Sequence, residues 1–198
     1  AGLFWFFTLS DFFQIQNILI SGNQKLKSGE IQSVLEKSIT RKILFLPTQS
    51  LLLLDAKGVR ESLQKNFILI DGLKLKRLLP RTLTVEIVEK KAVGAWCQKN
   101  DCFNLDKNGV IFEASAETIL RPVVRTEEAS QETILGQKVV ETKRLGEITE
   151  IQDRLKNSSQ VKIQEFTLLE KDQRLNAKTE EGWQIYFNLK GDLDWQIT

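Results

Sequence analysis

The sequence predicts an α+β fold in two units, an N-terminal β-α-α-β-β unit and a mostly antiparallel β unit behind it. Apolar and polar side chains alternate through residues 82–89, which is typical of a half-buried strand. Apolar residues instead recur every three or four positions after Ser28 and after Asp55, which predicts two helices. Beyond residue 91, short apolar segments are separated by turn residues, as in an antiparallel sheet.

The chain opens with a strongly apolar run. This run lacks the basic start of a signal peptide and is far shorter than the roughly 20 residues that a membrane-spanning helix needs. The chain contains no methionine, which indicates a fragment or a processed protein. We expect residues 1–12 to be the outer end of a transmembrane helix, and a buried first strand or helix is the alternative. The predicted membrane contacts are Leu3, Phe4, Trp5, Phe6 and Phe7.

The first unit is predicted over residues 13–91. A strand begins at Phe13, and a bulge near Gln16-Asn17 would turn Ile15 and Ile18 toward the same core. Gly22-Asn23 forms a turn, after which Ser28 caps the first helix. The core positions of this helix are Ile31, Val34, Leu35 and Ile39.

A loop containing Pro47 leads to the second helix, which Asp55 caps and which buries Val59 and Leu63. A strand over 67–70 continues through Leu73 and Leu75 until Pro80 interrupts it. The closing strand places three side chains inward, those of Leu83, Val85 and Ile87. Two helices on a three-stranded sheet would make a complete two-layer domain.

The second unit is predicted over residues 92–198. A hairpin turns at Gln98–Asp101, and Asp106–Gly109 forms a second turn before a strand over 110–112. The polar residues 126–142 give no clear pattern. A helix and three strands follow, over residues 144–156, 161–170, 174–179 and 183–189.

Two features of this unit are candidate sites. Cys97 and Cys102 flank the hairpin turn, so they would lie opposite each other and form a disulfide, and two free thiols are the alternative. On the last predicted strand, Trp183 shares one face with Ile185 and Phe187, and this face is expected to join the core. Gln184 and Tyr186 lie on the other face, where Tyr186 is a candidate partner contact.

The composition argues against catalysis. The chain has no histidine, the commonest general base and metal ligand, and its two cysteines cannot complete a structural zinc site. The acidic pairs Glu127-Glu128 and Glu180-Glu181 lie in polar segments and are read as solvated turns. No glycine-rich phosphate loop is present. We therefore expect no enzyme activity, no cofactor, no metal and no small-molecule substrate.

Charge is unevenly spread along the chain. Residues 1–91 hold 14 basic and 8 acidic residues, and residues 92–198 hold 14 and 18. A basic patch around Pro80 lacks interleaved aromatic residues, so nucleic-acid binding is not expected. We interpret the patch first as an ordinary solvated strand face, and contact with anionic lipid or an acidic protein is the alternative. The patch comprises Lys74, Lys76, Arg77 and Arg81.

Five segments together resemble the FtsQ/DivIB family of bacterial cell-division proteins, in the same order along nearly the whole chain. These segments are residues 13–23, 80–90, 92–96, 105–112 and 182–189. The resemblance implies the end of a transmembrane helix over 1–12, a POTRA domain over 13–91 and a β domain over 92–198. In that family another helix and a final strand follow the segment 182–189, so we expect the β domain to be truncated at its C-terminal end.

The resemblance further implies a single-pass protein of the cell (inner) membrane that lies mostly outside the cytoplasm. Such a protein would be a divisome scaffold with partners of the FtsB/DivIC and FtsL type, and its POTRA domain would bind other division proteins. Trp183, Gln184 and Tyr186 are the candidate partner contacts. The alternative is a POTRA-containing component of a secretion or outer-membrane assembly system, which would usually show several such domains.

Overall fold

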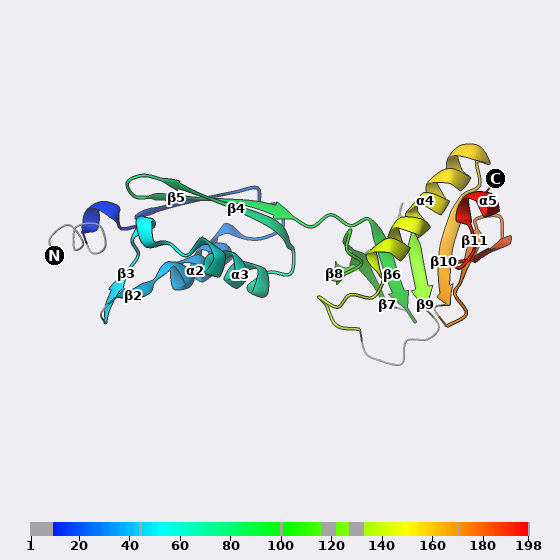
Figure 1. Ribbon diagram of the computed structural model, residues 1–198, viewed down its shortest axis with the longest axis horizontal. Coiled ribbons are helices and arrows are strands. Elements are labelled where there is room, and N and C mark those ends of the chain that lie inside the picture. The colour runs from blue at the N-terminus through cyan, green and yellow to red at the C-terminus, as the bar shows by residue number, and fades with distance from the viewer. Residues whose placement is uncertain are drawn as a thin grey trace. The chain divides into compact units, whose positions relative to one another are not determined.

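The computed structural model describes residues 10–43, 45–99, 101–115, 122–126, 133–169 and 171–197. The chain forms two compact units, Ala1–Lys90 and Lys91–Thr198, and each has its own hydrophobic core (Figure 1). The predicted α+β class is confirmed, and the predicted elements follow one another in the expected order, with three short strands among them that the sequence did not predict. The predicted remnant of a membrane helix falls on residues that lie mostly outside the described ones, and none of the described helices is long and apolar enough to cross a membrane.

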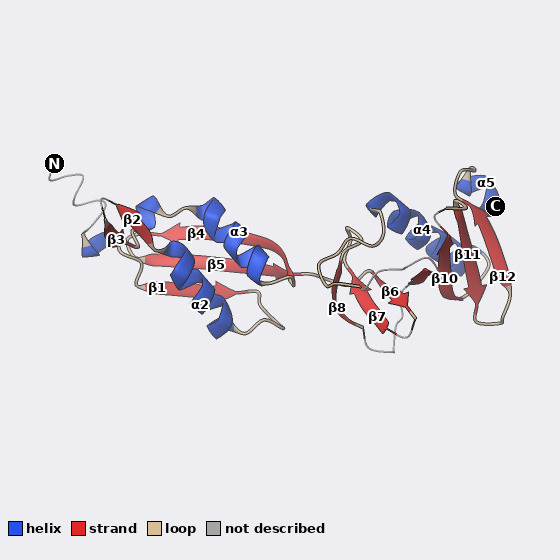
Figure 2. Cartoon of the chain, turned by 90° about the horizontal axis from the view of Figure 1, so that it is seen from below, coloured by secondary structure: helices blue, strands red, loops and turns tan. Residues whose placement is uncertain are grey.

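The first unit is a three-stranded sheet with two helices on one face (Figure 2). Its strand order is β1-β5-β4, in which β1 runs parallel to β5 and β4 antiparallel to it. A two-stranded hairpin, β2–β3, precedes the second helix. In chain order the elements are η1 (Asp11–Phe13), β1 (Asn17–Ser21), α2 (Ser28–Ile39), β2 (Arg41–Ile43), β3 (Leu46–Thr48), η2 (Leu51–Leu53), α3 (Ala56–Asn66), β4 (Ile70–Leu78) and β5 (Thr82–Glu89).

The core of this unit follows the predicted periodicities. Leu83, Val85 and Ile87 on the central strand β5 are buried, and burying each contributes about 1.5–3 kcal/mol. The two helices cover these side chains with an apolar stripe at helical spacing. The buried residues of the stripe are Ile31, Leu35, Ile39, Val59 and Leu63.

The start of the first unit differs from the expectation in one respect. Residues 11–13 form a 3-10 turn instead of a strand, because the Ser10 hydroxyl accepts the N–H of Phe12 at 3.3 Å. The bulge expected near Gln16-Asn17 is present, because the N–H groups of both residues donate to the same carbonyl, that of Arg81. Ile15 is therefore buried, although β1 begins two residues later.

Three local expectations in this unit were wrong. Lys27, and not Ser28, occupies the N-cap of α2, because the Ser28 hydroxyl instead accepts a hydrogen bond from the Asn23 amide at 3.1 Å. Pro47 lies within β3. The strand predicted from residue 67 begins at Ile70, because the preceding residues form the turn that ends α3.

The carboxylate of Glu89 closes the turn that leads from β1 to α2. It accepts the backbone N–H groups of Gln24 (2.8 Å), Lys25 (3.0 Å) and Leu26 (3.0 Å). Burial would raise the pKa of Glu89, but these N–H donors outweigh it and lower the pKa. Gly22 begins the same turn with φ +83°, and a β-carbon there would overlap the carbonyl oxygen of Ile87.

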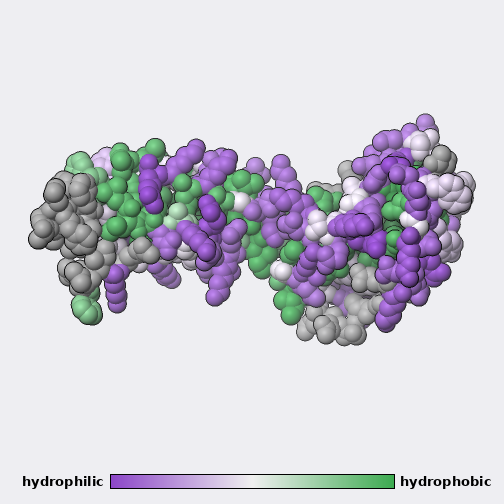
Figure 3. Space-filling view, viewed as in Figure 1, coloured by the Kyte–Doolittle hydropathy of each residue, from purple (hydrophilic) through white to green (hydrophobic). Residues whose placement is uncertain are grey.

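The second unit is a seven-stranded sheet in the order β12-β11-β10-β9-β6-β7-β8. Most neighbours are antiparallel, and β9 is parallel to both β10 and β6. Helix α4 packs on one face of the sheet (Figure 1), and its outer surface is mostly hydrophilic (Figure 3). The elements are β6 (Gly94–Gln98), β7 (Asp101–Leu105), β8 (Ile111–Ala114), β9 (Val123–Thr126), α4 (Thr142–Ser158), β10 (Ile163–Leu169), β11 (Arg174–Thr179), β12 (Gln184–Asn188) and α5 (Leu193–Ile197).

The sequence anticipated every strand of this sheet except β9. Four residues with no alternating pattern around them are too short to identify locally, and β9 is held by its two parallel neighbours. The turn at 106–109 forms as predicted, with the Asp106 carboxylate accepting the N–H groups of Asn108 and Val110. Gly109 adopts φ +77° there, and a β-carbon would overlap the carbonyl oxygen of Val140.

Candidate functional site

Strand β12 is an edge of the seven-stranded sheet. It pairs with β11 on one side, and among the described residues no strand pairs with its other side. The N–H of Thr179 donates to the carbonyl of Trp183 at 3.0 Å, and the N–H of Leu189 donates to the carbonyl of Gln173 at 2.8 Å. Bonded positions alternate along an antiparallel ladder. The backbone groups that point away from β11 are therefore those of Gln184, Tyr186 and Asn188.

A side chain from α5 occupies the last of these three positions. The Gln196 amide accepts the N–H of Asn188 at 2.7 Å and donates to the carbonyl of the same residue at 3.0 Å. This pair of bonds is the one that a neighbouring strand would make at Asn188. The outward backbone groups of Gln184 and Tyr186 are not covered by any described strand.

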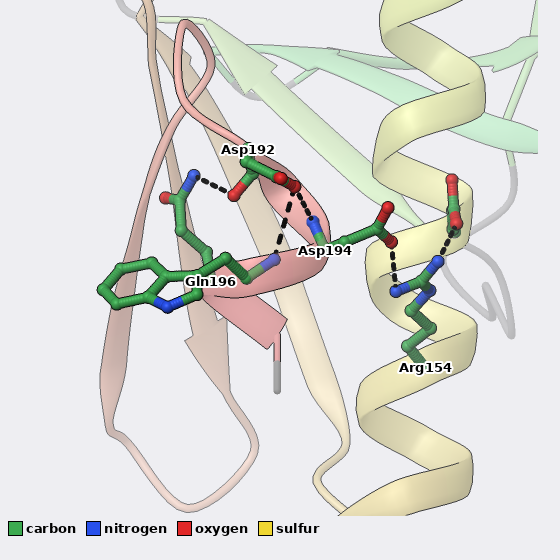
Figure 4. A network of polar contacts seen from close by, with 6 residues as sticks. Arg154, Asp192, Asp194 and Gln196 are labelled. Atoms are coloured by element: carbon green, nitrogen blue, oxygen red, sulfur yellow. Dashed lines mark hydrogen bonds and ion pairs between the residues drawn. The ribbon is translucent and has the colours of Figure 1, made fainter.

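Helix α5 is held in place by a polar network (Figure 4). The Asp192 carboxylate accepts the N–H groups of Asp194 (2.9 Å) and Trp195 (3.3 Å) at the helix start. The Arg154 guanidinium of α4 binds Asp194 at 2.6 Å and Glu150 at 2.6 Å. Hydrogen bonds with Asp194 and Glu150 raise the pKa of Arg154. The network links α5 to α4 and thereby positions Gln196 beside β12.

The three predicted partner contacts all lie at this edge. Tyr186 is 57% exposed, its hydroxyl donates to the Gln184 side chain at 2.5 Å, and the Arg174 guanidinium lies 5.9 Å from its ring centre. Trp183 is 61% exposed, so the expectation that it joins the core was wrong. It precedes β12, where its N–H donates to the Thr179 hydroxyl, whereas Phe187 on the same predicted face is buried.

The opposite edge of the sheet is covered by backbone groups at the start of β8. The N–H of Ile111 donates to the carbonyl of Gln137 at 3.0 Å, and the N–H of Gly136 donates back to Ile111 at 2.8 Å. Val110 forms an isolated antiparallel bridge with Lys138. Residues 136–139 thus act as a short strand along β8.

The cysteine pair lies away from this edge. Cys97 on β6 and Cys102 on β7 are directly opposed, with α-carbons 4.1 Å apart, and are joined by a disulfide. The predicted membrane contacts Leu3–Phe7 and the pair Glu127-Glu128 lie outside the described residues. Glu180 and Glu181 lie in the turn between β11 and β12. Within the described part of the chain, no three metal-binding side chains are grouped together.

Sequence reasoning did not identify Gln196, Arg154 or Arg174 as parts of this region. Their roles depend on which strand ends at the edge and on the packing of α5 against α4, and neither is encoded in a local pattern. The one local signal was Asp192, a helix-capping residue type just before the apolar residues of α5.

Two comparisons with known proteins agree with this architecture. A family model described as "POTRA domain, FtsQ-type" matches residues 13–90, which is the first unit without its N-terminal run. A protein of Bradyrhizobium diazoefficiens named "Cell division protein FtsQ" is 31% identical over 101 residues, which are 51% of this chain. The matched stretch spans 27% of that protein. The predicted resemblance is thus confirmed: this chain has an FtsQ-type POTRA domain at its start and is similar to a cell-division protein of the FtsQ type.

Proposed function

We propose that this chain is the extracytoplasmic part of a single-pass cell-membrane protein that acts as a non-enzymatic scaffold of the division machinery. The FtsQ-type POTRA domain and the similarity to a cell-division protein support this proposal. They also favour it over a component of a secretion or outer-membrane assembly system. The apolar residues 1–12 would belong to the membrane anchor, and residues 92–198 would form the β domain of the family.

We further propose that the open edge of β12 receives a strand from a partner of the FtsB/DivIC or FtsL type. The observation that carries this proposal is the contrast between the closed edge at β8 and the uncovered backbone groups of Gln184 and Tyr186. Uncovered N–H and C=O groups on an edge strand are satisfied by strand addition.

The side chains around this edge suit an elongated partner with acidic residues. Arg174 and Lys178 lie on β11 opposite Asn188 and Gln184, so they share the sheet face of Tyr186. A strand that pairs with β12 would present every second side chain to this face. Acidic side chains there would compete with Asp172, 3.9 Å from Arg174, and with Glu165, 3.8 Å from Lys178. The exposed indole of Trp183 would supply apolar contact area at the end of the strand.

A proline substitution tests strand addition directly. The N–H of Tyr186 points away from β11, so Tyr186→Pro removes an outward donor and no bond of the β11–β12 ladder. We expect this variant to lose at least tenfold in affinity for the FtsB/DivIC-type protein from the same genome, as measured by isothermal titration calorimetry. Tyr186→Ala, which keeps the N–H, should lose less.

Circular dichroism would confirm that both variants remain folded. Equal affinities for Tyr186→Pro and the unsubstituted chain would exclude β12 as the docking edge. A loss in Tyr186→Ala as large as that in Tyr186→Pro would show that the ring, and not the backbone, is recognised.

A further inference from the structure

One end of the first unit exposes large apolar side chains on three separate segments. Phe12 is 46% exposed on η1, Phe45 is 96% exposed in the β2–β3 turn, and Leu78 and Leu79 are 51% and 62% exposed where β4 turns toward β5. We call these four residues the apolar tip. Their exposure is unusual, because the other large apolar residues of β4 and β5 are mostly directed into the core.

Hydrogen bonds connect the start of the chain to the β4–β5 turn and to the base of the β2–β3 hairpin. The β4–β5 turn contacts the start of the chain through Arg81, whose carbonyl accepts two N–H groups of residues 16–17 and whose guanidinium lies 5.8 Å from the Phe12 ring centre. On the other side, the Gln14 side chain accepts the N–H of Gln49 at 2.8 Å, just after β3. The base of the β2–β3 hairpin and the β4–β5 turn therefore flank residues 12–17.

The views agree with this placement. Figures 1 and 2 both show the β2–β3 turn and the β4–β5 turn at the end of the first unit where the N-terminus enters. On the face shown in Figure 3, apolar side chains gather at that end. Residues 1–9, which are almost entirely apolar in sequence, lead into Ser10 at the same end.

The backbone of Phe45 adopts a conformation that phenylalanine rarely takes. It adopts φ 72°, the left-handed region in which glycine or asparagine would be less strained. An exposed phenylalanine contributes nothing to the core of the hairpin, so folding alone does not account for it. Strain of this kind at an exposed site points to a role in binding.

Basic side chains border the apolar tip. Lys42 is exposed on β2, beside the turn that holds Phe45, and Arg81 contacts Phe12. Lys76 precedes Leu78 on the same outward face of β4 and lies 3.8 Å from Glu86. Asp11 is an acidic neighbour, and the net charge of the residues around the tip remains positive.

We propose that the apolar tip inserts into the interfacial region of an anionic lipid bilayer. Phe12, Phe45, Leu78 and Leu79 would enter the boundary between headgroups and acyl chains, and Lys42 and Arg81 would bind anionic headgroups. A bilayer matches isolated apolar residues on three short turns, whereas a protein partner would need a continuous groove or strand edge. The contact would hold the POTRA domain at the membrane surface, independently of the docking edge at β12.

Vesicle binding by the whole chain tests the proposal. The tip variant Phe45→Asn/Leu78→Ser/Leu79→Ser removes apolar area, and asparagine suits the backbone at residue 45. A control variant, Ile134→Ser/Trp195→Ser, removes two other exposed apolar residues, 68% and 81% exposed, from the second unit. The probes are vesicles of phosphatidylcholine alone and of phosphatidylcholine mixed with phosphatidylglycerol.

Because residues 1–9 can bind vesicles by themselves, hydrogen exchange at the tip is measured together with affinity. We expect the backbone amides of residues 42–46, 77–79, 81 and 82 to exchange at least fivefold more slowly on the mixed vesicles than in solution, with less protection on phosphatidylcholine alone. The tip variant should lose this protection and bind the mixed vesicles at least tenfold more weakly. The control variant should behave like the unsubstituted chain.

Three results would overturn the proposal. They are unchanged exchange at both turns on vesicles, equal protection in the tip variant, and equal affinity of the control and tip variants. Protection of both turns by a soluble division protein, but not by vesicles, would assign the tip to a protein partner instead.

Discussion

The two edge strands of the seven-stranded sheet, β8 and β12, differ in how their outward backbone groups are covered. Residues 136–139 cover the start of β8 with backbone hydrogen bonds, whereas a single glutamine side chain covers one position of β12. Open edges favour unwanted pairing, so proteins usually protect them. An edge that is left open next to a closed one is therefore a candidate for a function, and the contrast locates that function on β12.

The largest loss of stability is expected for a substitution of Gly109, beside which residues 136–140 lie. Gly109→Ala places a β-carbon against the Val140 carbonyl at a positive φ, which should displace residues 136–140 from β8. We expect the free energy of unfolding to fall by about 2–4 kcal/mol in urea titration. Gly182→Ala is the matched control, because it has φ +93° but nothing within 4 Å.

The control variant should lose only about 1 kcal/mol, the cost of the left-handed conformation itself. If both variants lost the same amount, the contact with Val140 would not matter to the closure of β8. An increase in self-association of Gly109→Ala, seen by sedimentation, would show that closing this edge also prevents strand pairing between molecules.

Glu89 and Gln196 both bind backbone groups through their side chains, but only Glu89 carries a charge. The stabilisation from Glu89 should therefore depend on pH. Because the folded-state pKa of Glu89 is lowered, its contribution is present above the unfolded pKa, near 4.5, and is lost as pH falls through the folded value. We expect Glu89→Gln to destabilise the chain by about 1–2 kcal/mol at pH 7. Urea titrations at pH 7 and pH 3 would measure this difference.

At pH 3 the difference between Glu89→Gln and the unsubstituted chain should shrink, because this pH is below the unfolded pKa, so the unfolded chain gains a proton at this carboxylate. Glu86→Gln is a suitable control, because Glu86 is exposed on the same strand and contacts Lys74 and Lys76 at 3.9 and 3.8 Å only. The same pH dependence in both variants would contradict a specific role for the Glu89 carboxylate.

The smallest effect on stability is expected at the partly covered edge. Gln196→Ala removes both bonds to Asn188 and should cost about 0.5–1.5 kcal/mol. Hydrogen exchange followed by NMR should show faster exchange of the Asn188 amide, with the Val139 amide at the closed edge unchanged. Unaltered exchange at Asn188 would mean that Gln196 does not protect the strand.

Local sequence patterns predicted the helices and strands of this protein better than they predicted which strands lie at the edges of its sheets. Residues 82–89 were identified because both the alternation and the burial of Leu83, Val85 and Ile87 arise within one strand. Strand β9 was missed because its four residues are stabilised by neighbours 28 and 42 positions away in sequence, such as Ala95 and Thr167.

The candidate site was predicted only in part for the same reason. Tyr186 was placed on the outer face from the alternation of β12, but Trp183 was wrongly extended into that pattern, because the strand begins one residue later. A local pattern cannot show that β12 lies at an edge, because this depends on the order of the strands in the sheet. Gln196 could not be linked to Asn188 without knowing how the chain turns after the strand.

The disulfide between Cys97 and Cys102 has a consequence for the whole sheet. Because the two residues are directly opposed, the bond allows one alignment of β6 with β7. A slip by one residue would turn Leu105 away from the core and move Phe103 to the opposite side. In the oxidised protein such misaligned hairpins are excluded covalently, so β9, which pairs with β6, meets a hairpin with a single alignment.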